Sequence, residues 1–175
     1  MYNNKALKFN VGSLIESTTG VRDLYSFEGP VLFEGIDTKS IIKGKLEMMR
    51  IYEGVNVKVT NVEIKVGFRC CKCLKDYIQK IIIKMAERQF LLEEPFKIDD
   101  PAELFLIDRK ALAIDLTESL RQEIILHFPP IPVCSKSCLG LCPVCGRDRN
   151  KEKCKCVIGR ELPANKPLSD LKKIY

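Results

Sequence analysis

The sequence lacks the signatures of most catalytic sites. It contains no glycine-rich phosphate loop and no Gly-x-Ser-x-Gly elbow, which excludes P-loop enzymes and elbow-type serine hydrolases. Histidine occurs once, at His127, whereas a hydrolytic zinc ion usually needs histidine or carboxylate ligands around an open coordination position. The acidic pairs at 93–94 and 99–100 fall in a polar stretch and are interpreted as solvated charge. We therefore predict that the protein is not an enzyme.

Long apolar runs are also missing. Aliphatic runs such as residues 81–83 are far shorter than the roughly 20 residues that span a bilayer. Residues 1–5 carry no apolar stretch behind a basic start, so we expect no secretory leader and no membrane contact. The expected location is the cytoplasm, a reducing compartment in which thiols persist and structural disulfides are rare.

Cysteine, in contrast, is abundant, with nine residues in a chain of 175. Hydrophobic residues at 46% and charged residues at 30% are ordinary for a globular protein, so cysteine is the unusual feature of the composition. A disulfide framework is the alternative to metal binding, and the reducing compartment argues against it. The cysteines are therefore candidate metal ligands.

Alternating apolar residues predict a largely antiparallel sheet in the first half of the chain. The alternation runs from 55 to 59 and resumes in the opposite parity from 62 to 68, which indicates a β-bulge near residues 60–61. Glu53 and Gly54 are expected to form the turn before this strand. Further strands are predicted at residues 24–27, 30–34, 42–48, 77–85 (with Tyr77, Ile81, Ile83 and Met85 on its apolar side) and 105–107.

One helix is predicted after the strands. Asp115 is the expected N-cap, with Glu118 as its capping-box partner three positions later. The apolar stripe of the helix comprises Leu116, Leu120, Ile124 and Phe128, and two prolines end it at 129–130. Residues 93–103, which are acidic and contain two prolines, are expected to form a surface loop.

These patterns predict an α+β fold in three parts. Residues 1–133 form a mainly antiparallel sheet covered by the helix, with closure into a barrel-like form left open as a variant. Residues 134–160 form a cysteine-rich zinc knuckle, because they hold six cysteines and too few large apolar side chains for a hydrophobic core. Residues 161–175 form a linker and a short helix at 168–174.

The knuckle contains one complete set of four thiol ligands. In Cys142-Pro143-Val144-Cys145-Gly146, proline fixes φ and glycine adopts a positive φ, so both sulfurs point at one ion. Cys154 and Cys156 lie at i and i+2 of an extended segment and face the same side. The two pairs together complete a tetrahedral site.

A second set of four is predicted between distant parts of the chain. Cys70 and Cys73 lie between two predicted strands, at a hairpin tip, and need two more ligands. Cys134 and Cys138 are the two ligands not already used by the local set of Cys142, Cys145, Cys154 and Cys156. Cys71 is left over and is interpreted as a chance thiol. The alternative, a redox-active Cys-x-x-Cys, conflicts with the strand setting, because thioredoxin-like thiols begin a helix.

Basic charge is concentrated after residue 133. Residues 1–133 hold 19 basic and 19 acidic side chains, whereas residues 134–175 hold 10 basic and 4 acidic ones. Each four-thiolate zinc site carries a double negative charge, so two sites offset about two thirds of the formal +6. The remaining excess is compatible with RNA or with an acidic protein. The candidate RNA contacts are Arg147, Arg149, Lys151, Lys153 and Lys155.

The chain resembles the YceD family, also called DUF177, over nearly its whole length. The resemblance rests on Cys70-Cys71-Lys72-Cys73-Leu74, on Asp115-Leu116, on residues 126–132, and on Cys134-x3-Cys138-Leu139-Gly140-Leu141-Cys142-Pro143-Val144-Cys145-Gly146 through Asn150, Cys154 and Cys156. It implies a role in accumulation of large-subunit ribosomal RNA, and supplies no catalytic residues.

The function predicted from the residues and the resemblance together is a non-catalytic zinc-binding factor for assembly of the large ribosomal subunit. It would bind two zinc ions and contact precursor ribosomal RNA or a ribosomal protein. The alternative is a protein–protein adaptor in which the knuckle is a rigid docking surface without RNA contact.

Overall fold

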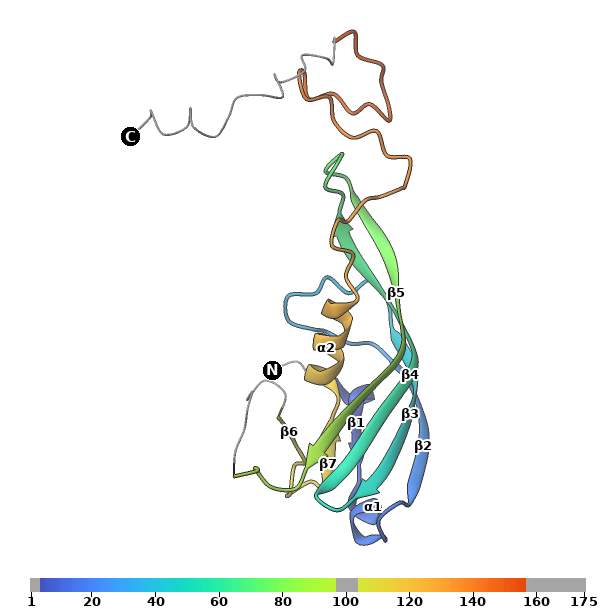
Figure 1. Cartoon of the computed structure of the whole chain (residues 1–175). Helices are drawn as coiled ribbons and strands as arrows, with labels where there is room; N and C mark the ends of the chain where they lie inside the picture. The colour runs from blue at the N-terminus through green and yellow to red at the C-terminus, as the bar shows by residue number, and fades with distance from the viewer. Residues whose placement is uncertain (1–3, 97–103, 157–175) are drawn as a thin grey trace, which may run out of the picture.

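The computed structural model, which describes residues 4–96 and 104–156, is built on a long, twisted and mainly antiparallel sheet (Figure 1). Its strands are β2 (Arg22–Gly29), β3 (Ile42–Ile51), β4 (Gly54–Arg69), β5 (Asp76–Leu91) and β6 (Phe105–Leu106), in that spatial order. Strand β6 is parallel to β5, and the other neighbours are antiparallel. The sheet does not close into a barrel, which corrects the barrel-like variant.

Shorter elements lie across one face of this sheet. They are η1 (Lys5–Leu7), β1 (Lys8–Asn10), α1 (Gly12–Glu16), β7 (Ala113–Asp115) and α2 (Thr117–Leu126). Strands β1 and β7 form a separate two-stranded sheet. Helix α2 packs its buried Leu120 and Ile124 against the core, as predicted. The two short helices near the N-terminus were not predicted, because five residues or fewer carry no readable helical period.

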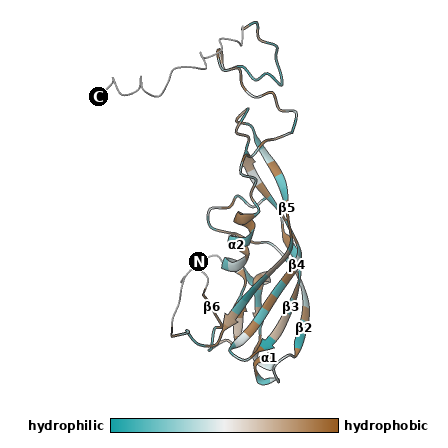
Figure 2. Ribbon diagram, in the orientation of Figure 1, coloured by the Kyte–Doolittle hydropathy of each residue, from teal (hydrophilic) through white to brown (hydrophobic). Residues whose placement is uncertain are grey.

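The alternation along the strands follows the predicted pattern, with one exception. Hydrophobic and hydrophilic positions interleave along β3, β4 and β5 (Figure 2). The register between β3 and β4 shifts between Lys43 and Lys45, opposite the predicted bulge, and Asn61 has φ 52°. The same irregularity leaves Met85 57% exposed, so its predicted place on the apolar side is wrong. Phe90 continues the buried side in the shifted parity.

Residues 30–34 do not form the predicted strand. Val31 and Phe33 are buried, but the backbone of Leu32 between them bonds to a side chain instead of a strand. Asn4, which is 3% exposed, accepts a hydrogen bond from the Leu32 N–H at 2.9 Å and donates one to the Leu32 carbonyl at 3.0 Å. A primary amide offers the donor and acceptor of a peptide group, so one side chain satisfies this backbone.

Two predicted boundaries also move. The turn between β3 and β4 is Tyr52 and Glu53, one residue earlier than expected. Asp115 is not the N-cap, because it ends β7, where it pairs with Lys8. Its carboxylate still accepts a hydrogen bond from the Thr117 N–H at 2.9 Å, while Glu118 bonds to Arg121 and forms no capping box. The helix therefore begins at Thr117.

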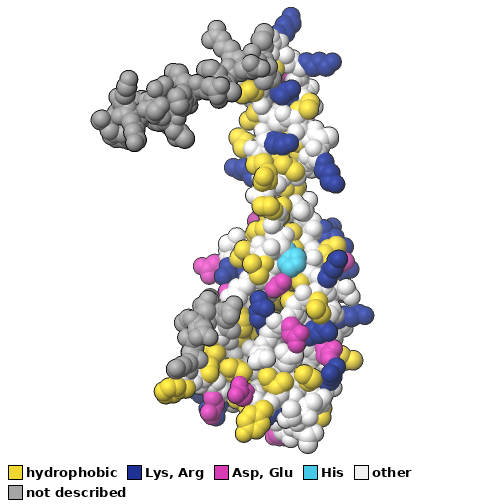
Figure 3. Space-filling model, viewed as in Figure 1, with side chains coloured by type: hydrophobic (Ala, Val, Ile, Leu, Met, Phe, Trp, Pro, Cys, Tyr) yellow, Lys and Arg dark blue, Asp and Glu magenta, His cyan; other side chains and the backbone are white. Residues whose placement is uncertain are grey.

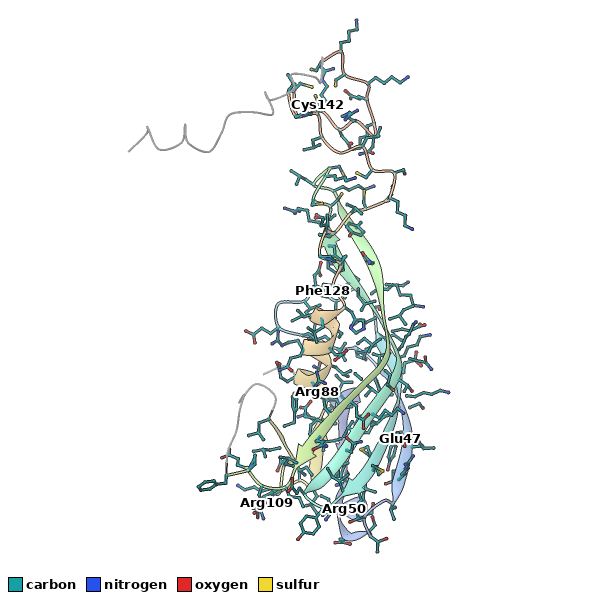
Figure 4. The ribbon with its side chains drawn as sticks, viewed as in Figure 1. Glu47, Arg50, Arg88, Arg109, Phe128 and Cys142 are labelled. Carbon is teal, nitrogen blue, oxygen red and sulfur yellow. The ribbon has the colours of Figure 1, made fainter. Side chains whose placement is uncertain are left out.

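Strands β4 and β5 extend beyond the rest of the sheet as a two-stranded arm (Figure 1). Strand β3 pairs with β4 only as far as Glu63, whereas β4 and β5 stay paired up to Arg69 and Asp76. Phe68 of the arm packs edge-to-face on Phe128, which follows α2, at a centroid distance of 4.9 Å. This contact directs the chain after the helix along the arm (Figure 4).

The predictions that concern residues 97–103 and 157–175 lie outside the described residues. They include most of the predicted loop at 93–103, the end of the 134–160 module, the linker at 161–175 and its short helix. Residues 93–96 are exposed, as a surface loop requires. The described part contains no helix that is long and apolar enough to span a membrane.

Candidate metal centres

Eight of the nine cysteines gather into two groups of four at one end of the molecule (Figure 4). All nine lie within the described residues, and all are free thiols. Within each group the four sulfur atoms lie within 4.8 Å of one another. Cys71 is exposed and belongs to neither group. The first centre contains Cys70, Cys73, Cys134 and Cys138, and the second contains Cys142, Cys145, Cys154 and Cys156, the two sets predicted from the spacing.

The first centre joins the tip of the arm to the chain after α2. Its sulfur atoms are 3.9 Å apart between Cys70 and Cys138 and 3.6 Å apart between Cys73 and Cys134. In a tetrahedral site with zinc–sulfur bonds of about 2.3 Å, neighbouring sulfurs are about 3.8 Å apart. The donor set therefore has the size of a four-thiolate zinc site. Cys70, Cys73 and Cys138 are buried, and Cys134 is half-buried.

A tight turn at the arm's tip brings the first two thiols together. The Leu74 N–H donates to the Cys70 carbonyl at 2.9 Å, and the Cys70 N–H donates to the Lys75 carbonyl at 2.9 Å. Leu74 adopts a left-handed conformation with φ 59°. This reverses the chain directly after Cys73, so that both sulfurs face the same side.

The turn in the second centre repeats the same pattern. The Gly146 N–H donates to the Cys142 carbonyl at 2.9 Å, and the Cys142 N–H donates to the Arg147 carbonyl at 2.8 Å. Gly146 has φ 72°, which confirms the expected positive φ. Leu74 therefore occupies the position that glycine occupies here, although a left-handed conformation is costly for leucine.

Each centre contains a thiol whose pKa is lowered and a thiol whose pKa is raised. Burial raises the pKa of Cys70, but the backbone N–H groups of Cys134, Cys73 and Lys72 outweigh burial and lower that pKa to about 6. The hydrogen bond of Cys134 with the sulfur of Cys73, followed by burial, raises the pKa of Cys134 to about 12. Four thiolates so close together repel one another, and a divalent cation between them supplies the opposite charge.

In the second centre, too, the pKa of one thiol is lowered and the pKa of another is raised. Backbone N–H groups of Cys145 and Val144 lower the pKa of Cys142 to about 6. The hydrogen bond of Cys156 with Cys145, followed by burial, raises the pKa of Cys156 to about 12. Because thiolate sulfur is a soft ligand, the donor sets of both centres suit zinc better than magnesium or calcium.

Residues 139–141 connect the two centres and are held from both sides. On the side of the first centre, the Leu141 N–H donates to the Lys72 carbonyl at 2.9 Å. On the side of the second centre, the Arg149 N–H donates to the Gly140 carbonyl at 3.0 Å. Gly140 has φ 72° and passes so close to Lys72 that a side chain there would clash with its carbonyl.

Asn150 makes the most direct contact between the centres. It lies in the loop between the two cysteine pairs of the second centre, and its amide donates to the Cys138 sulfur of the first centre at 3.5 Å. Its Oδ1 accepts from the Leu139 N–H at 2.8 Å. Neither Asn150 nor Leu74 was predicted to have a role at these centres. Leu74 could have been found from its place after Cys-x-x-Cys, but no local signal points from Asn150 to Cys138.

The five predicted RNA contacts lie in the segment between Cys145 and Cys156, two ligands of the second centre. Arg147, Lys151, Lys153 and Lys155 are exposed, and Arg149 is half-buried. Figure 3 shows basic side chains spread around this end of the molecule. Within residues 4–96 and 104–156, none of these five side chains forms an ion pair.

Comparison with known proteins agrees with the cysteine pattern. The model of the family described as "Large ribosomal RNA subunit accumulation protein YceD" matches residues 59–174, which include all nine cysteines. Proteins of Mycobacterium tuberculosis H37Rv and Mycobacterium bovis, both described only as uncharacterised, are 33% identical over 117 residues. The match covers 63% of this chain and 53% of each relative, so the chain spans about half the length of the curated relatives it matches.

No solved structure matches the chain significantly. The family match covers well over half of the sequence and includes the arm, helix α2 and both groups of cysteines. The chain belongs to the YceD family of large ribosomal RNA subunit accumulation proteins.

Proposed function

We propose that this protein is a non-catalytic factor that supports accumulation of large-subunit ribosomal RNA in the cytoplasm by binding precursor ribosomal RNA at its cysteine-rich end. This end comprises the turn at 70–75 and residues 134–156. The observation that carries the proposal is the presence of two four-thiol centres beside unpaired basic side chains. Family membership supports the ribosomal role.

Zinc is the proposed metal, with the eight clustered cysteines as its ligands. Closed sites with four thiolates are structural, because they leave no coordination position for water or substrate. The metal would supply binding energy and charge compensation, while the arm and the chain after α2 place the sulfurs. A role in folding, rather than in chemistry, fits a site whose donors are all cysteines.

Residues 134–156 need metal binding for a stable fold, because they have almost no hydrophobic core of their own. The only buried apolar side chains in this segment are those of Cys138 and Cys142. Structural zinc contributes about 10–16 kcal/mol in small zinc modules, comparable to the net stability of a whole domain. Metal binding would therefore hold this segment in one conformation and present its basic side chains on a fixed frame.

RNA is the favoured partner because the five basic side chains form no ion pair with an acidic side chain within the described residues. Unpaired lysine and arginine side chains on a rigid frame bind phosphates, and such binding weakens steeply as salt concentration rises. A charge-reversal variant, R147E/K151E/K153E, tests this in its metal-loaded form against large-subunit ribosomal RNA fragments. We expect the affinity to fall at least tenfold and the salt dependence to become shallower.

The matched control changes three exposed lysines remote from the cysteine-rich end, in the variant K5E/K84E/K110E. It alters the net charge by the same amount, so it separates a local effect from overall charge. Equal losses in both triple variants, or no loss in R147E/K151E/K153E, would contradict RNA binding at this end.

A protein–protein adaptor is the second candidate, and exposed apolar side chains favour it. Leu74, Leu139 and Val144 are 58%, 57% and 67% exposed at the cysteine-rich end. A ribosomal protein bound there would cover them, and its affinity would depend little on salt. Salt-insensitive binding that survives R147E/K151E/K153E but is lost on L139S/V144S would support the adaptor.

A further inference from the structure

Residues 139–141 connect the two centres, and their backbone forms hydrogen bonds with both of them. Cys138 belongs to the first centre and Cys142 to the second, so residues 139–141 alone separate a ligand of one from a ligand of the other. The Leu141 N–H bonds to Lys72, in the turn of the first centre, and the Gly140 carbonyl accepts from Arg149, in the loop of the second. A displacement of either loop therefore moves the connecting residues.

Asn150 adds a contact to a ligand atom itself. Its Nδ2 group lies 3.5 Å from the Cys138 sulfur and 2.7 Å from Oδ1 of Asp148, and its backbone N–H donates to the same Asp148 oxygen at 3.0 Å. Its Oδ1 accepts from Leu139. The amide is thus fixed in one orientation, with a donor directed at a ligand of the first centre.

The position of Asn150 depends on the second centre. It lies between Cys145 and Cys154, so the loop that carries it is closed only when these two ends are brought together. Asp148 and Arg149, which hold the amide and the connecting residues, belong to the same loop. An N–H donor to a metal-bound thiolate stabilises its charge, and loss of such a supporting contact typically lowers metal affinity about 10–100-fold.

We infer that the two centres bind metal cooperatively, and that Asn150 is the positioning residue through which filling of the second centre strengthens the first. The inference rests on the metal binding proposed above and goes beyond it in linking the sites. By thermodynamic reciprocity, the first centre strengthens the second by the same factor. Repulsion between two negatively charged four-thiolate centres acts in the opposite direction, so the sign of the coupling discriminates between the two effects.

Cobalt(II) titration of the full, reduced chain measures the coupling, because thiolate ligation gives Co²⁺ an intense charge-transfer absorption. The second centre is disabled in C142S/C145S and the first in C70S/C73S. Each disabled variant is expected to bind one ion at the remaining centre about 10–100-fold more weakly than the intact chain binds there. N150A is expected to weaken the first centre by a similar factor while leaving two ions bound at saturation.

The variant N150A/C142S/C145S completes a double-mutant cycle, which measures how far the effect of Asn150 depends on the second centre. If Asn150 carries the coupling, N150A has less than about a threefold effect once the second centre is disabled. K153A, in the same loop and with its exposed side chain outside these contacts, is the matched control and should bind as the unmodified chain does. Native mass spectrometry at half saturation should show fewer singly loaded chains than independent filling would give, calculated from the affinities of the two disabled variants.

Independent filling of the centres, or a stronger first centre in C142S/C145S, would overturn the inference and leave the proposed metal binding intact. An N150A effect that persists undiminished in the disabled background would also overturn it, because the residue would then act on the first centre alone. Absence of any thiolate-to-cobalt absorption in the reduced chain would overturn both the inference and the proposed metal binding.

Discussion

Substitution of Gly140 by alanine provides a test in which the structure assigns two separate penalties. Gly140 has φ 72°, a conformation that costs a non-glycine residue about 1–2 kcal/mol. Alanine recovers about 0.4–1 kcal/mol of this by restricting the unfolded chain. In addition, a Cβ at this position would lie 2.9 Å from the Lys72 carbonyl oxygen and 3.2 Å from the Lys72 Cβ.

The second penalty is not easily relieved. The obstructing atom belongs to the backbone, and the same Lys72 carbonyl accepts the hydrogen bond from Leu141 that joins the connecting residues to the first centre. Overpacking against a rigid neighbour costs about 1–3 kcal/mol. After subtraction of the recovered entropy, the two penalties together predict a loss of about 1–4.5 kcal/mol, or roughly a 5- to 2000-fold weaker affinity for metal, because folding of this end and metal binding are coupled.

G146A is the matched control, because Gly146 has the same φ of 72° and no atom lies within 4 Å of its added Cβ. Only the conformational penalty applies there, so we expect a loss of about 1 kcal/mol. Competition with a chromophoric chelator measures both affinities at one pH and salt concentration. If G140A bound metal as tightly as G146A does, a side chain at position 140 would cause no clash with Lys72. The conclusion that residues 139–141 are held tightly between the two centres would then be refuted.

Three further perturbations have outcomes fixed by the structure. L74G should leave metal affinity unchanged or raise it roughly two- to fivefold in the same competition assay. Glycine relieves the left-handed strain at φ 59°, and the leucine side chain that is lost is 58% exposed. A tenfold loss of affinity would show that the side chain itself supports the turn. N4A should lower the free energy of unfolding by about 2–3 kcal/mol in urea, because the Leu32 backbone loses both its partners; an unchanged midpoint would contradict the role of Asn4. Chelation followed by limited proteolysis should expose residues 134–156 while the sheet stays protected, and resistance of the apo segment to cleavage would argue against metal-dependent folding.

Sequence periodicity predicted those elements whose side chains meet a continuous core. The alternation in β3, β4 and β5 was readable because each strand buries one face, and the shift of parity located the bulge beside Asn61. The strand predicted at residues 30–34 was wrong. Val31 and Phe33 alternate into the core, but the side chain of the distant Asn4, and not a neighbouring strand, bonds to the backbone of Leu32 between them. A contact across 28 residues leaves no local trace.

The membership of each cysteine group was predictable because spacing restricts which sulfurs can meet. Cys142 and Cys145 with Cys154 and Cys156 form a local set, and the remaining pairs could only combine across the fold. The link between the sets was not predictable from the sequence. It depends on how Asn150 and Gly140 approach Cys138 and Lys72, and these approaches follow from the three-dimensional course of two loops.

The zinc content of the purified, reduced protein tests the central claim most directly. Native mass spectrometry combined with elemental analysis should find two zinc ions per chain, with C70S and C142S each holding no more than one. A fully reduced chain that carries no metal, and in which amide hydrogen exchange nevertheless shows residues 134–156 to be as protected as the sheet, would contradict the account.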